Sequence, residues 1–543
     1  MPDSLSRPPV APLWLAVFSL GVATAAFLPT LGGGFLADDF VYVSRFFAYP
    51  WSDWPRLFTR EWSEGVWGFP LIELRPVSAL AFMVDARLWG AEAAGYRVTN
   101  LLLHLGVVWA VLRLTWRLSG GHTLGTLSAA LAFALHPAHV EPVSWITGRV
   151  DLLATLAALV FWNLAEGWSA AGGRWRAGGA LAALLAGVFA KELCLFAPPL
   201  LALRWISVDP RVGRHVWVRR GLLLAGVVAV ALLYTAARRA AFGDGATVPA
   251  SSWTSDDAWR RQASYAAWIA PVLPLLQQFE LTSLPSADVL RAVGVGVAGL
   301  SLALLSLAAW KGNRRLGNLV FFTGIWWVGT IGGLLLVGYF SARHLYFPTT
   351  GLAVGFGLAV AAVRSSRGRF IAAGGLLWLG AAHVVAVRPW IENGLISRRL
   401  TATLQREVPR LAPDAIVIVD ARELRRNVFL WFWACPQALG RPFLEPPLDP
   451  SRVLTRGGLY FRPEQWQKDI QPLDRCRSAN GALVVDTTDT GQIRFTTLSA
   501  AELVKALPAL AERANDGDGL HSPELSGWVD TVLRTHPATK RIP

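Results

Sequence analysis

The sequence predicts an α-helical polytopic membrane protein that ends in a small α/β domain, and three observations support this fold class. Of the 543 residues, 53% are hydrophobic and only 16% are charged, whereas about 25% of the residues of a soluble globular protein are charged. Long apolar runs alternate with short Arg-rich connectors as far as residue 388. Beyond that residue the apolar runs become short and alternate with polar residues.

A run of about 20 apolar residues crosses the roughly 30 Å hydrocarbon core of a bilayer as a helix, which satisfies its own backbone hydrogen bonds there. The first run, Leu13 to Leu31, is too long for the core of a signal peptide, so we interpret it as a retained span. We expect about 11 transmembrane helices, at 12–31, 98–117, 123–136, 151–167, 177–190, 192–206, 219–240, 289–309, 318–339, 345–363 and 370–388.

The arginines predict the orientation of these spans. With a cytoplasmic N-terminus, every second connector is strongly basic, as the positive-inside rule requires of cytoplasmic loops. The other connectors hold acids, histidines and aromatics, and we expect them at the outer face of the cell (inner) membrane. We interpret 263–283 as an interfacial or re-entrant segment. Another span there would place the basic connector of Lys311, Arg314 and Arg315 on the outer side of the membrane. The basic positions are Arg113 and Arg117; Arg174 and Arg176; Arg204, Arg211, Arg214, Arg219 and Arg220; Lys311, Arg314 and Arg315; and Arg364, Arg367 and Arg369.

The formal net charge of +14 would suggest nucleic-acid binding in a soluble protein. Here the arginines lie at the ends of apolar runs, so membrane topology explains them and we expect no nucleic-acid partner. The three cysteines show no metal-binding spacing. Cys435 and Cys476 lie in the C-terminal tail, and we predict that they form a disulfide there if the tail is outside the cytoplasm.

The C-terminal tail predicts a separate soluble unit. Strand-like alternation occurs at Ala415–Asp420, Leu483–Asp486 and Ile493–Thr497, and Ala501–Ala514 has a helical pattern. We therefore expect a polytopic domain over 1–388 and an extracytoplasmic α/β domain over 389–543.

Two carboxylates follow the first span directly, at Asp38 and Asp39. They open a loop rich in Trp and Phe, which favours helices that lie on the membrane interface. A carboxylate at the start of a helix is common, so these residues are candidates either for chemistry or for capping of an interfacial helix.

The second outer loop holds His136, His139 and Glu141, followed by Arg149 and Asp151. Ionisable groups at membrane depth are costly and tend to be functional. The spacing matches no standard metal motif. The alternative to a functional role is that these residues belong to a hydrogen-bonded loop that packs beneath the first outer loop.

Cations occur at two further outer positions, in the pairs Lys191–Glu192 and Arg343–His344. Lys191–Glu192 is also consistent with a pair of neutralising charges that marks a turn. Arg343 is also consistent with a single side chain that reaches the lipid headgroups. Cations that face carboxylates on another loop suit a lipid-linked phosphate, and a carboxylate there is able to act as general base on an acceptor hydroxyl.

The order and spacing of several motifs resemble membrane glycosyltransferases of the GT-C fold, most closely the transmembrane O-mannosyltransferases that modify cadherins and their bacterial relatives. Those bacterial relatives often carry tetratricopeptide repeats, whereas this tail looks unrelated. The motifs occupy residues 37–43, 74–78, 96–104, 134–145, 148–153, 190–192 and 342–348.

The resemblance implies a sugar donor linked to a polyprenyl phosphate, held in the membrane, and an inverting transfer to a hydroxyl of an unidentified protein or glycan acceptor outside. It implies Asp38 as the base, with Asp39 as second choice. It implies no cofactor or required metal, because the cations compensate the charge; a divalent metal is not indicated. The implied phosphate ligands are Arg343, Lys191 and His344, and the implied pocket-lining residues are Arg75, His136, His139, Glu141, Arg149 and Asp151.

Two other functions stay open. A lipid or polysaccharide transporter (a flippase) would line its pathway with ionisable residues, but such proteins usually contain two related halves, and no internal repeat is visible here. A non-catalytic membrane scaffold would not need Asp38 and Asp39.

Overall fold

The computed structural model of the chain describes residues 11–64, 72–243, 313–334, 341–421, 424–426, 428–431, 435–455, 476–488, 490–514 and 522–542, together with residues 307, 310 and 311. The expected span 289–309 and the expected interfacial segment 263–283 therefore lie outside the described residues, apart from residue 307.

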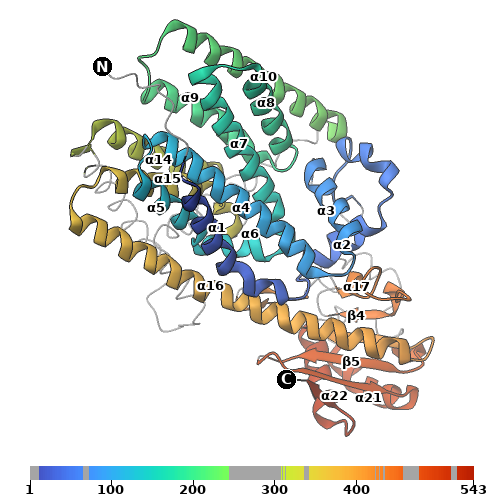
Figure 1. The fold of residues 1–543 in the computed structure, drawn as a ribbon. Helices are drawn as coiled ribbons and strands as arrows, with labels where there is room; N and C mark the ends of the chain where they lie inside the picture. The colour runs from blue at the N-terminus through green and yellow to red at the C-terminus, as the bar shows by residue number, and fades with distance from the viewer. Residues whose placement is uncertain are drawn as a thin grey trace.

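Helices form most of the described chain up to residue 407 (Figure 1). The α-helices are α1 (Leu13–Phe27), α2 (Asp38–Ala48), α3 (Pro76–Trp89), α4 (Ala93–Leu118), α5 (Thr123–Ala134), α6 (Val140–Ser144), α7 (Arg149–Ala171), α8 (Arg174–Val188), α9 (Ala197–Ser207), α10 (Arg214–Phe242), α14 (Arg314–Gly333), α15 (Pro348–Ala362) and α16 (Ser366–Glu407). Short 3-10 helices join them: η1 (Leu28–Gly32), η2 (Trp51–Phe58), η3 (Pro137–His139), η4 (Ile146–Gly148), η5 (Glu192–Phe196), η9 (Ala342–Leu345) and η10 (Val408–Arg410).

Six of these helical segments are long and apolar enough to cross a membrane, and α5 and α15 are shorter apolar helices. Each expected span other than 289–309 overlaps a helix. The chain is a multi-pass membrane protein.

Small residues bring α5 and α15 into close contact. A side chain added at Gly125 would collide with the Gly357 carbonyl and with Ala361, and one added at Gly357 would collide with the Gly125 carbonyl and with Ala129. Both helices thus carry small residues four positions apart at their interface, which is how membrane helices approach closely in the absence of a hydrophobic driving force.

Several of the basic connectors lie together at one end of the helices. Asp209 binds Arg204 at 2.8 Å and lies 3.7 Å from Arg315. The Trp168 indole donates to the Arg219 carbonyl at 2.9 Å. These contacts join the connectors after α7, α9 and before α14, which the positive-inside pattern assigns to a common side.

The helix α16 is 42 residues long, which at 1.5 Å per residue is about 63 Å. That length is about twice the hydrocarbon thickness of a bilayer. The helix therefore continues through residue 388, the expected end of the last span, and reaches the tail, as Figure 1 shows.

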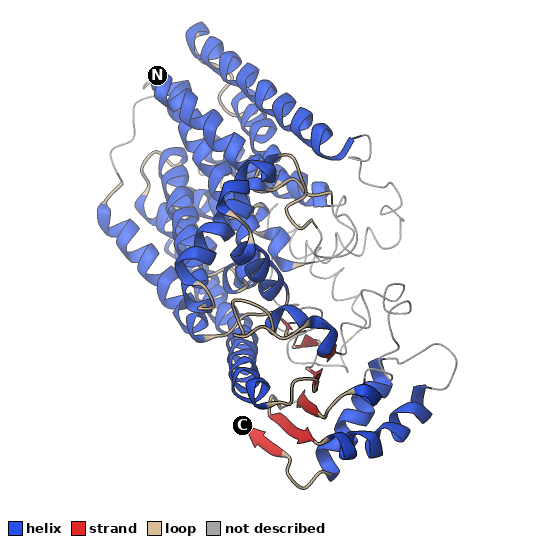
Figure 2. Cartoon of the chain, turned by 90° about the vertical axis from the view of Figure 1, so that its right-hand side faces the viewer, coloured by secondary structure: helices blue, strands red, loops and turns tan. Residues whose placement is uncertain are grey.

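The tail contains a five-stranded sheet of order β4-β1-β5-β6-β7, which Figure 2 shows gathered at one end of the molecule. Strand β1 is parallel to β4 and β5, and β6 is antiparallel to β5 and β7. The expected strands are present as β1, β5 and β6, and the expected helix as α21. The elements are β1 (Ile416–Asp420), β2 (Leu424–Arg425), β3 (Val428–Phe429), α17 (Cys435–Ala438), η11 (Pro450–Arg452), β4 (Val453–Thr455), β5 (Ala482–Thr487), β6 (Ile493–Leu498), α21 (Ala500–Ala514), α22 (Ser522–Thr535) and β7 (Lys540–Ile542).

The two faces of this sheet pack into different cores. Ile416 and Ile418 of β1 join the core formed with α21 and α22, while Val417 and Val419 join a second core that includes residues of α2 and α3. The alternation follows from the two-residue period of a strand. One face of the sheet thus shares a buried core with the loop that follows the first span.

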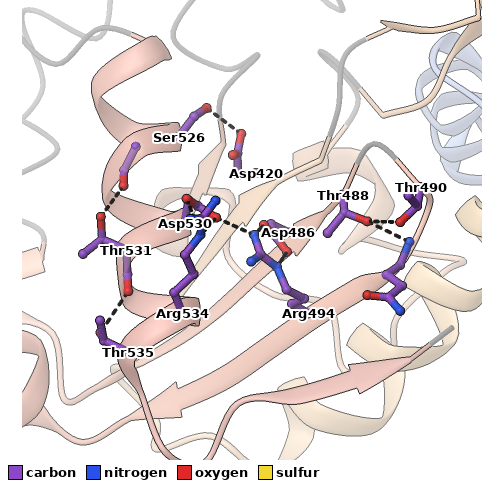
Figure 3. A network of polar contacts seen from close by, with 12 residues as sticks. Asp420, Asp486, Thr488, Thr490, Arg494, Ser526, Asp530, Thr531, Arg534 and Thr535 are labelled. Carbon is purple, nitrogen blue, oxygen red and sulfur yellow. Dashed lines mark hydrogen bonds and ion pairs between the residues drawn. The ribbon is translucent and has the colours of Figure 1, made fainter.

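Polar contacts fasten α22 to the sheet (Figure 3). Arg494 of β6 donates to Asp486 of β5 through Nε at 3.0 Å and to Asp530 of α22 at 2.9 Å. Ser526 of α22 donates to Asp420 at the end of β1 at 2.9 Å. The side chain of Cys435 lies outside the described part of the structure, so its disulfide with Cys476 stays a prediction.

Candidate active site

The helix α2 begins with the two expected carboxylates. Asp39 is fully buried, and its carboxylate accepts hydrogen bonds from the Leu36 amide at 3.0 Å and from the amide and hydroxyl of Thr147, each at 2.9 Å. Asp39 therefore joins the start of α2 to η4 in the second loop that the sequence pattern assigns to the outer side. Asp38, in the same turn, is half-buried.

A buried arginine supports this arrangement. Arg97 of α4 donates to the carbonyls of Gly33 and Gly34 in the segment before α2, and through Nε to the Ser144 carbonyl at 3.0 Å. Burial raises the pKa of Asp39 from 3.8 to about 6, although the charge of Arg97 and the hydrogen bonds lower it. At neutral pH Asp39 is thus a carboxylate held by three donors.

Asp39→Asn is expected to destabilise the folded protein by about 1–3 kcal/mol, because the amide nitrogen cannot accept from the Leu36 or Thr147 amides. Since the folded-state pKa is raised, the wild type gains stability relative to the variant as the pH falls through about 6 towards 3.8, and loses that gain as the pH rises again. Melting temperatures of both proteins in nanodiscs, across this pH range, check the prediction. A pH-independent difference between the two would contradict it.

Three cations from separate segments gather beside the second loop. The Lys191 Nζ atom lies 2.5 Å from Asp151 Oδ1. Arg75 pairs with Glu73 at 2.9 Å and lies 3.6 Å from Glu192. Lys191 and Arg75 therefore each have a carboxylate neighbour, so the positive and negative charges of these residues nearly cancel.

Arg343 lies near a carboxylate and an aromatic ring of the second loop. Its Nη1 atom lies 4.0 Å from Glu141, and its guanidinium covers the Trp145 ring at 4.6 Å from the ring centre. Burial, and then the charges of Lys191, Arg343 and Arg75, lower the pKa of His344 well below its ordinary value. His344 is consequently neutral at pH 7 and suited to hydrogen bonding rather than to charge.

Trp145 connects the cations to the carboxylates. Its indole N–H donates to the Leu36 carbonyl at 3.2 Å, and the amide of that same Leu36 donates to Asp39. The ring thus lies between Arg343 and the start of α2. Trp145 and Thr147 were not predicted as site residues, although Trp145 ends the motif 134–145; their partners are distant in sequence, so no local pattern could indicate this role.

Of the two histidines of the second loop, His139 joins α5 to α15, and His136 caps the short helix η3. His139 is fully buried; its Nδ1 donates to the Phe133 carbonyl at 2.7 Å and its Nε2 lies 2.6 Å from the Thr349 hydroxyl. His136 accepts through Nδ1 from the Ala138 amide at 3.3 Å. Ser341 donates to Glu141. Among the described residues, no three His, Cys, Asp or Glu side chains form a group that could hold a metal ion.

Arg149 has its own carboxylate partner, on α3. Its side chain is fully buried and pairs with Asp85 of α3 at 2.7 Å. It covers the Phe82 ring at 4.3 Å and donates to the carbonyls of Ala81 and Tyr96, each at 3.3 Å. Its contacts join α3, α4 and α7.

Comparison with known proteins finds relatives of one kind. No family model matches the chain. The chain is 33% identical over 100 residues to the Protein O-mannosyl-transferase Tmtc1 of Drosophila melanogaster, which is 17% of this chain and 12% of that protein. It is 30% identical over 152 residues to Tmtc2 of the same fly (26% and 16%) and 33% identical over 118 residues to human TMTC4 (18% and 16%). The matches thus span less than a fifth of these relatives' length.

Solved structures give weaker likenesses. The arabinofuranosyltransferase AftD from Mycobacteria matches 77% of this chain and 32% of its own with a TM-score of 0.41 and 16% identity. ArnT from Cupriavidus metallidurans matches 87% of this chain and 93% of its own with a TM-score of 0.37 and 15% identity. At these values the folds correspond only loosely. The sequence relatives confirm the resemblance that the motifs predict, and this multi-pass membrane protein is similar, over part of its length, to the protein O-mannosyl-transferases.

Proposed function

We propose that this protein is a membrane glycosyltransferase of GT-C type that moves a sugar from a polyprenyl-phosphate donor to an acceptor hydroxyl at the outer face, with inversion at the anomeric carbon. The observation that carries the proposal is the gathering of Arg75, Lys191 and Arg343, from three separate outer connectors, beside the second outer loop, whose Thr147 binds Asp39. The partial likeness to O-mannosyl-transferases makes mannose the first sugar to test.

The charges of the site suit this reaction. As the bond between the anomeric carbon and the phosphate breaks, the leaving phosphate gains negative charge, which nearby cations stabilise. The acceptor oxygen attacks from the opposite face, and its proton passes to a carboxylate. Asp38 is the better base, because Asp39 already accepts three hydrogen bonds.

The packing of the tail indicates that the tail and the proposed site lie on the same side of the membrane. The tail shares one buried core with α2 and α3, so the proposed site and the tail lie on one side of the membrane. The positive-inside rule assigns the basic connectors to the cytoplasm. We therefore place the N-terminus in the cytoplasm, the tail outside the inner membrane, and the functional division at 1–388 and 389–543.

The direct experiment uses the full chain in nanodiscs, labelled polyprenyl-phosphate sugars and a panel of protein and glycan acceptors with free hydroxyls. Transfer with inverted anomeric configuration is the expected result. Retained configuration would contradict the single displacement. In vesicles, movement of the labelled lipid across the bilayer without transfer would instead favour the transporter.

Arg343→Gln is expected to weaken binding of a polyprenyl-phosphate mannose about tenfold, since a hydrogen bond to a charged group contributes about 1.5–3 kcal/mol. Binding of the radiolabelled lipid to the protein in nanodiscs measures this. Arg56→Gln is the matched control, because Arg56 is exposed in the same outer region and pairs with Asp53 at 2.8 Å. Equal binding by the two variants would remove Arg343 from the donor site.

A further inference from the structure

The segment that leads into α2 is held by the C-terminal tail. The Ala37 amide donates to the Leu430 carbonyl at 2.9 Å. The ring of Phe40 meets the rings of Trp431 at 4.9 Å and Phe443 at 5.0 Å, both edge-on. Figure 1 shows α17 of the tail beside α2, and the two helices are in contact.

A buried relay adds a second attachment. The Trp431 indole donates to the Ser397 hydroxyl at 2.7 Å, and that hydroxyl donates to the Phe35 carbonyl. Trp431 and Ser397 are both fully buried, so water cannot replace a lost partner and each broken bond leaves an unpaired polar group. The relay runs from the tail through α16 to the segment before α2.

The backbone between these two attachments is strained. Ala37 has a φ of 45°, a conformation that costs a residue with a side chain about 1–3 kcal/mol. Such a conformation persists only where surrounding contacts hold it. The contacts that hold Ala37 include its own hydrogen bond to Leu430, and the next residue in the chain is Asp38.

We propose that Trp431 and Ser397 are positioning residues that set the location of Asp38, so that the tail is part of the catalytic unit. The inference rests on the proposed transferase function. The proposal gives the tail a role in the reaction itself, whereas the sequence of the tail suggests only an appended soluble domain. Shifts of about 1 Å in a reacting group lower rates by as much as about 100-fold.

Trp431→Phe tests this, because it removes the indole N–H and keeps a ring against Phe40. Trp528→Phe is the matched control: Trp528 is 2% exposed, donates to the Ala506 carbonyl at 2.9 Å and lies in the core on the other face of the sheet. We expect kcat to fall about tenfold or more in Trp431→Phe and in Ser397→Ala, with donor affinity unchanged, and Trp528→Phe to keep the wild-type kcat. Ser397→Thr, which retains the hydroxyl, should recover activity.

Hydrogen exchange of the peptide that covers residues 35–40 gives a readout that does not need activity. We expect faster exchange there in Trp431→Phe and Ser397→Ala than in Trp528→Phe. Wild-type exchange and wild-type kcat in Trp431→Phe would overturn the inference, as would equal losses in Trp431→Phe and Trp528→Phe. If the wild type transfers no sugar, the proposed function fails, while the exchange data still decide whether the tail holds this segment.

Discussion

Asp38→Asn is expected to lower the rate of sugar transfer about 100- to 10,000-fold, the usual contribution of a general base. The substitution keeps the size of the side chain, but it removes the negative charge and the ability to take a proton, and it replaces one acceptor oxygen by an NH₂ donor. Because Asp38 lies in the first turn of α2 and the three cations lie on other segments, binding of the lipid donor should stay within about twofold of the wild type. Single-turnover transfer and donor binding, measured in the same nanodiscs, separate the two effects.

Asp53→Asn is the control for this experiment. Asp53 lies in the first turn of η2, after α2 in the same connector, and pairs with Arg56 at the surface, so the variant makes the same change of charge without touching α2. Full activity of Asp38→Asn, together with an inactive but folded Asp39→Asn, would move the base to Asp39. Full activity of both would favour the scaffold or transporter.

The apolar runs and the alternation of apolar and polar residues are local features of the sequence, and they correctly predicted helices and strands that form from such local patterns. The expected spans 98–117 and 123–136 coincide with α4 and α5, and the expected strands coincide with β1, β5 and β6. The last helix is longer than predicted: Arg388 and Pro389 end the apolar run, yet α16 continues to Glu407. A helix that leaves the bilayer no longer needs apolar residues on every face.

The candidate site depended on contacts that no local pattern contains. Asp39 and Thr147 are 108 residues apart in sequence, and the motifs indicated that both loops matter without pairing these residues. The family resemblance likewise ranked Asp38 before Asp39 as the base, but no sequence pattern indicated that their burial differs. Successive side chains of a helix point in different directions, and Asp39 is the one that faces Thr147, a contact that appears only in three dimensions.

Arg149→Met is expected to destabilise the protein by about 3–5 kcal/mol, because the change leaves Asp85 buried without its cation. Its sequence motif implied that Arg149 lines the donor pocket, whereas its guanidinium is 2.7 Å from Asp85 and fully buried. Melting temperature in nanodiscs measures the loss, and Arg56→Met, at the exposed surface, should change stability by no more than about 0.5 kcal/mol.

The double variant Arg149→Met/Asp85→Asn distinguishes the two roles. If Arg149 serves the fold, removal of the orphaned charge recovers much of the lost stability, since a buried ion pair often contributes little net energy over its neutral replacement, and donor binding returns with the folded protein. If Arg149 instead contacts the donor phosphate, the double variant melts near the wild-type temperature but still fails to bind the lipid. Recovery of both properties would show that the Arg149–Asp85 pair fixes α3 against α7 and does not contact the donor.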